Sequence, residues 1–62
     1  MFRKTLDTVE LEEIYRLLAK AIDRVGAEKE SLFLTKLAMM LANELGDIEF
    51  VRRSIDEAAN HL

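Results

Sequence analysis

The chain has 62 residues, half of them hydrophobic, with a formal net charge of −3, no cysteine and a single histidine. A chain of this length forms one domain, here residues 1–62, and buries only about 60% of its unfolded surface. Domains this small usually gain extra stability from disulfides, a bound metal or association with another chain. Without cysteine and with one histidine, this chain has no disulfide and no multi-histidine metal site, so association is the remaining source of stability.

Charge and hydropathy exclude further classes of partner. The acidic balance argues against a nucleic acid or an anionic membrane as the partner. The basic start, Arg3 and Lys4, precedes no apolar run long enough for a signal-peptide core, and no segment approaches the length of a membrane span. We expect a cytoplasmic protein, and the absence of cysteine fits a reducing compartment.

The first predicted helix covers residues 8–25. Its hydrophobic residues recur at the i, i+3, i+4, i+7 spacing of a helix with one buried stripe, namely Leu11, Ile14, Tyr15, Leu18, Ala21, Ile22 and Val25. Asp7 and Glu10 have the spacing of a capping box, and Gly26 suits a left-handed position just past the helix end.

The second predicted helix, residues 28–45, is apolar almost all round. One broad face carries Phe33, Leu34, Leu37, Ala38, Leu41 and Leu45. Leu32 and Met39 project to the opposite side, next to polar residues. A helix that is apolar on two sides is normally packed on more than one flank, so we expect a second subunit to cover the flank that this chain leaves open.

The third predicted helix covers residues 48–60, with Gly46 ending the preceding helix and Asp47 as N-cap. Its stripe consists of Ile48, Val51, Ile55, Ala58 and Leu62. Phe50 lies off this stripe and lacks an evident partner within the chain. The predicted fold class is all-α, a helical hairpin plus a third helix that assembles into a dimeric bundle, with stripe residues such as Leu18, Leu37 and Ile55 in an internal core.

Two segments of the sequence carry a resemblance to a known family. Residues 14–26 read Ile-Tyr-x-Leu-Leu-Ala-x-Ala-Ile-Asp-x-Val-Gly, and residues 32–47 read Leu-Phe-Leu-x-Lys-Leu-Ala-x-x-Leu-Ala-Asn-Glu-Leu-Gly-Asp. These patterns resemble a family of short bacterial all-helical proteins known as a domain of unknown function, often encoded near flavin-dependent aromatic hydroxylases. The resemblance implies a compact helical fold and an accessory role in aromatic catabolism. It rests on packing residues and helix caps and brings no catalytic motif.

Candidate chemistry is sparse. Glu57 and His61 are i, i+4 neighbours that could face one metal ion, but two ligands do not make a metal shell. Ser31, Thr35 and Ser54 have no histidine nearby in sequence to activate them. We therefore predict no enzymatic activity, no metal and no cofactor.

Tyr15, Met39 and Met40 are the residues that could line a ligand pocket. The packing role is favoured, because a tyrosine on an apolar stripe and adaptable methionines are typical of cores and contacts. The sequence leaves the ligand-pocket alternative open.

The sequence thus favours a non-catalytic helical protein-interaction module, a homodimer or an accessory protein. We predict a protein interface at the hydrophobic residues that lie off the helix stripes, namely Leu17, Leu32, Met39 and Phe50. The alternative is an obligate small subunit of a larger enzyme, such as a flavin-dependent aromatic hydroxylase. A helix-turn-helix DNA-binding protein is less favoured, because Asp47 and Glu49 would face the phosphates.

Overall fold

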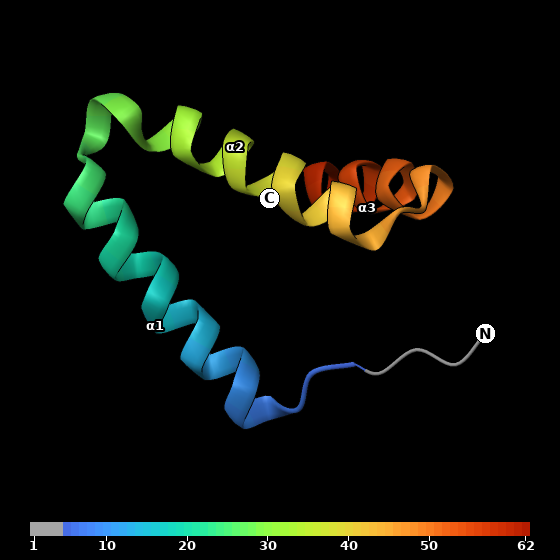
Figure 1. Cartoon of the computed structure of the whole chain (residues 1–62), viewed down its shortest axis with the longest axis horizontal. Coiled ribbons are helices and arrows are strands. Elements are labelled where there is room, and N and C mark those ends of the chain that lie inside the picture. The colour runs from blue at the N-terminus through green and yellow to red at the C-terminus, as the bar shows by residue number, and fades with distance from the viewer. Residues whose placement is uncertain (1–4) are drawn as a thin grey trace.

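The computed structural model describes residues 5–62, which form three α-helices and one short 3₁₀ turn (Figure 1). The elements are α1 (Thr8–Val25), η1 (Ala27–Lys29), α2 (Glu30–Leu45) and α3 (Ile48–Asn60). The described residues contain no strand, so the all-α, three-helix prediction is confirmed. The helices at 8–25 and 48–60 have the predicted bounds, whereas α2 begins later than expected because η1 takes up residues 27–29. The basic residues Arg3 and Lys4 lie outside the described part.

The N-terminal end of α1 is closed by the predicted capping box. The backbone N–H of Glu10 donates to Asp7 Oδ1 at 2.8 Å, and the backbone N–H of Asp7 donates to Glu10 Oε1 at 3.1 Å. Each side chain thereby satisfies a donor that the helix leaves without a backbone acceptor. The cap fixes where α1 begins.

The elbow, which we define as residues 26–29, connects α1 to α2. Gly26 has φ 89° and ψ 161°. Its φ is positive as predicted, but its ψ is extended, so the expected left-handed helical conformation is wrong. The combination of positive φ and extended ψ is accessible essentially to glycine alone. The N–H of Gly26 donates to the Ile22 carbonyl and its carbonyl accepts from the Lys29 N–H, both at 3.1 Å. The elbow is therefore a hydrogen-bonded bend with a defined direction.

The junction between α2 and α3 follows the prediction. Gly46 adopts the left-handed helical conformation, φ 71° and ψ 25°, and its N–H donates to the Ala42 carbonyl at 3.0 Å. Asp47 caps α3, its Oδ1 accepting from the Phe50 N–H at 3.0 Å. Because the connection is so short, α3 folds back beside the C-terminal half of α2 (Figure 1).

The arms of the chain, α1 on one side and α2 with α3 on the other, form an open V (Figure 1). The Cα radius of gyration is 13.2 Å, against about 11 Å for a compact domain of this length. Among the described residues, Cα atoms twelve or more positions apart in sequence stay more than 8 Å from each other. The single chain therefore does not have the compact shape that the family resemblance implies.

An internal core is absent from the described part of the chain, where no hydrophobic side chain is buried. Leu18 and Leu37 are half-buried, and Ile55 is 65% exposed. The expectation that these three residues form a core within the chain is wrong. The physical reason is the elbow, which turns α1 away so that most of each apolar stripe has no helix opposite it.

Candidate protein-interaction surface

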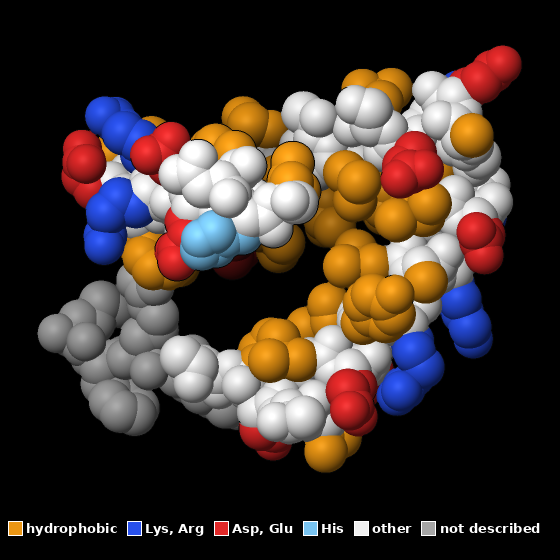
Figure 2. All heavy atoms as spheres, turned by 180° about the vertical axis from the view of Figure 1, so that it is seen from behind, with side chains coloured by type: hydrophobic (Ala, Val, Ile, Leu, Met, Phe, Trp, Pro, Cys, Tyr) orange, Lys and Arg blue, Asp and Glu red, His pale blue; other side chains and the backbone are white. Residues whose placement is uncertain are grey.

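Hydrophobic side chains gather along the sides of the two arms that face each other (Figure 2). On α1 they belong to the predicted stripe. Leu18, Ile22 and Val25 near the elbow are half-buried, while Leu11 and Ile14 farther out are exposed. Burial thus fades with distance from the elbow, because only there does another helix lie close by.

A groove of about 300 Å³ runs between α2 and α3. We call it the α2–α3 groove; it is lined by Ala38, Leu41, Ala42, Leu45, Phe50, Val51, Ser54, Ile55 and Ala58. Ser54 is the one polar residue among them, and its hydroxyl donates to the Phe50 carbonyl at 2.8 Å. The hydroxyl of the one polar side chain in the lining already has a hydrogen-bond partner, so the groove suits an apolar occupant.

Phe50 differs from the prediction in its surroundings. It lies in the α2–α3 groove with Val51 and Ile55, is 38% exposed, and has the guanidinium carbon of Arg53 5.8 Å from its ring centroid. This is the range of a cation–π contact. The view that Phe50 has no partner within the chain is therefore wrong, although most of the groove that it helps to form stays open.

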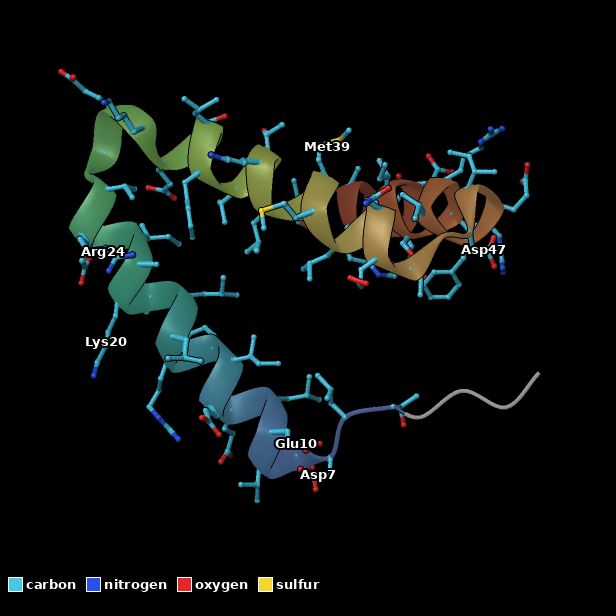
Figure 3. The ribbon with its side chains drawn as sticks, in the orientation of Figure 1. Asp7, Glu10, Lys20, Arg24, Met39 and Asp47 are labelled. Atoms are coloured by element: carbon cyan, nitrogen blue, oxygen red, sulfur yellow. The ribbon has the colours of Figure 1, made fainter. Side chains whose placement is uncertain are left out.

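The other three predicted interface residues do not join Phe50. Met39 is 67% exposed and points away from α1, on the outer side of α2 (Figure 3). Leu32, 68% exposed, shares that side by helical periodicity. Leu17, 58% exposed, lies on α1 beside Lys20 and Arg24. Met39 borders a hollow that shares Ala42 and Val51 with the α2–α3 groove, whereas Leu17 lies on another helix. The role of these residues as an interface remains a prediction.

Sequence reasoning missed the groove itself. Leu41 and Leu45 appeared as members of a broad internal face of α2, and Ile55 as part of an internal stripe. The spacing of Phe50, Ser54 and Ala58, four residues apart, already places them along one line on α3. That signal indicates that the apolar surface of α3 extends beyond the stripe to Phe50, with Ser54 as its one polar member.

Groups that could carry chemistry stay dispersed. Within residues 5–62, no three His, Cys, Asp or Glu side chains come close enough to hold a metal ion together. Tyr15 is 74% exposed and so does not line an enclosed pocket. The ion pair between Arg52 Nη1 and Glu49 Oε2, 3.8 Å apart, is solvent-exposed and contributes about 0–1 kcal/mol at most.

Comparisons with known proteins add no relative. No protein-family model, curated protein or solved structure matches the chain. The family resemblance, with its hydroxylase connection, therefore stays a prediction. In the described part of the chain, every helix is too short or too polar to cross a lipid bilayer.

Proposed function

We propose that this protein is a non-catalytic, cytoplasmic protein-interaction module that acts as a homodimer. The observation that carries the proposal is the surface area of the single chain. A compact monomer of this mass exposes about 4,100 Å², whereas this 7.1 kDa chain exposes 6085 Å². The excess, about 2,000 Å² per chain, comes with unburied Leu, Ile, Val, Met and Phe side chains on all three helices.

The exposed surface area in excess of a compact monomer is as large as the area that a stable dimer buries. Two open chains, each exposing 6085 Å², that close into one compact particle of twice the mass would bury about 5,400 Å² in total. Obligate homodimers bury upwards of about 2,000 Å² and have interfaces that resemble a domain core cut in half. A second copy brings an equal apolar excess, and a two-fold axis matches the two surfaces without requiring any further component.

The test is the assembly mass together with thermal unfolding over a wide dilution series. We expect sedimentation to give twice the mass of the chain, and the melting midpoint to rise with protein concentration because folding is coupled to association. A monomeric mass with a constant midpoint contradicts the homodimer. A chain that is monomeric alone and folds only with a larger protein captured from its host supports the alternative, an obligate subunit of a larger enzyme.

A further inference from the structure

We infer that the dimer is formed by exchange of arms, with the apolar stripe of α1 from each chain packed into the α2–α3 groove of the other. This inference rests on the proposed homodimer and adds which surfaces meet. Each chain thereby provides the helix that packs into its partner and the groove into which the partner's helix packs.

The groove has the chemistry that an amphipathic helix requires. Eight of its nine lining residues are apolar, and Ser54, the ninth, is satisfied by the Phe50 carbonyl. Leu41 and Leu45 belong to the face of α2 that continues from Phe33 and Leu37 near the elbow. An amphipathic helix that lays apolar residues spaced i, i+3, i+4 and i+7 into such a groove is a recurrent mode of recognition.

α1 has the matching chemistry. Its hydrophobic residues form one stripe, whose outer members Leu11 and Ile14 lie exposed, while Lys20 points away from α2 (Figure 3). The stripe is long enough for the groove, because α1 has 18 residues, a length of about 27 Å, whereas the groove lining on α2 runs only from Ala38 to Leu45.

The geometry of the elbow favours packing of α1 into the groove of the partner chain over packing into the groove of its own chain. Its two hydrogen bonds, Gly26 N–H to Ile22 and Lys29 N–H to Gly26, fix the bend that directs α1 away from the groove of its own chain. A second copy can then bring its own α1 to that groove, and symmetry makes the two contacts equivalent. A hairpin closed within one chain would instead require α1 to swing about the elbow, away from the direction that these two hydrogen bonds hold.

The absence of cysteine allows a direct test by engineered disulfides. Ile14 on α1 and Leu41 on α2 are equally far from the elbow, and Ser54 lines the groove together with Leu41. We therefore choose Ile14→Cys and Ser54→Cys, made as two single variants and mixed with oxidised glutathione as the oxidant. The expected product is a covalent heterodimer that contains most of the mixed protein. The matched control, Lys20→Cys mixed with Ser54→Cys, should show little of it, because Lys20 points out of the V.

The double variant with both cysteines on one chain separates the possible outcomes. A covalent dimer joined by Ile14–Ser54 disulfides supports arm exchange. A dimer in sedimentation that forms no such disulfide overturns arm exchange but leaves the homodimer standing. A monomer, with or without a disulfide inside the chain, overturns both. Should Ile14→Cys lose its helicity, the pair Leu18→Cys and Ala38→Cys probes the same contact nearer the elbow, and its failure to cross-link within a dimer counts equally against arm exchange.

Discussion

At the scale of single residues, the two glycines perform different tasks. A Cβ at either position would meet no atom within 4 Å, so space does not explain either glycine. Gly46 holds a left-handed helical conformation that asparagine also adopts. Gly26 holds an extended conformation with positive φ that is essentially restricted to glycine. The direction of the elbow therefore depends on Gly26, which no other amino acid can replace without backbone strain.

The first prediction compares asparagine at these two positions. Gly26→Asn should lower the free energy of unfolding of the assembled protein by about 1–3 kcal/mol. Gly46→Asn, the control, should cost less than about 1 kcal/mol, because asparagine tolerates the left-handed helical region. Urea unfolding followed by far-UV circular dichroism at a fixed protein concentration measures both. Equal losses at the two positions would show that the backbone conformation of Gly26 is not what defines the elbow.

The capping box gives a second prediction at this scale. Asp7→Ala removes the acceptor of the Glu10 N–H and should lower the free energy of unfolding by about 0.5–2 kcal/mol. Asp7→Asn retains an oxygen at the same place and should lie close to the unchanged protein. The same urea titration measures both variants. A loss of free energy of unfolding in Asp7→Asn as large as in Asp7→Ala would assign the effect to the negative charge at the helix end instead of the hydrogen bond.

At the scale of elements, the sequence predicted the three helices and the bounds of α1 and α3, but not the 3₁₀ turn before α2 or what the helices pack against. The bounds of α1 and α3 follow from local signals, namely caps, glycines and apolar spacing; the structure confirms these bounds and both N-caps, whereas Gly26 differs from its predicted conformation. The expected core at Leu18, Leu37 and Ile55 required contacts between distant residues. Those contacts depend on the direction of the elbow, which a ψ angle at Gly26 sets and which helical periodicity does not report.

The third prediction concerns the α2–α3 groove. Phe50→Glu places a charge among apolar residues and should weaken dimerisation by about 2 kcal/mol or more, which is about thirtyfold in the dissociation constant. Arg52→Ala serves as the control on the same helix, since it removes only an exposed ion pair. Sedimentation over a concentration series gives both constants. A dissociation constant for Phe50→Glu that matches the Arg52→Ala value would take the groove out of the interface.

The fourth prediction concerns the outer side of α2. Leu32→Lys and Met39→Glu put charges on hydrophobic side chains that are about two-thirds exposed in the single chain. If the outer side is covered in the assembly, as the sequence predicts, both changes should lower the melting midpoint at a fixed concentration. Asn43→Gln, which adds no charge beside Met39 on α2, is the control. Midpoints that do not move would restrict the interface to the inner surfaces of the V.

At the scale of the whole molecule, the single chain has helices without a core. Its shortest helix, α3, has 13 residues, which lies within the range of about 12–15 residues below which an isolated helix is marginal in water. Most helical stability in proteins comes from packing of an apolar face. In the single chain these faces are open, and in the homodimer that we propose folding and association would be one process. The length and composition of the sequence indicated this dependence, since half of its residues are hydrophobic.

The fifth prediction is that a chain prevented from dimerising loses its structure. Small-angle scattering of Phe50→Glu at low concentration should give a radius of gyration near the value for an unfolded chain of this length, about 24 Å. A value close to 13.2 Å would mean that the open V persists alone, and a value near about 11 Å would mean that the chain closes on itself. The dimeric protein, measured in parallel, is the control.

The open V also has a consequence for the amount of this protein in a cell. A dimer that folds only on encounter forms in proportion to the square of the concentration of free chains, and free chains are open to proteases. At low synthesis most copies would be degraded before they meet, whereas a modest increase in synthesis would raise the folded population more than proportionally. If the protein is the homodimer proposed above, the elbow that separates the two arms would make the abundance of the folded form respond like a threshold to expression.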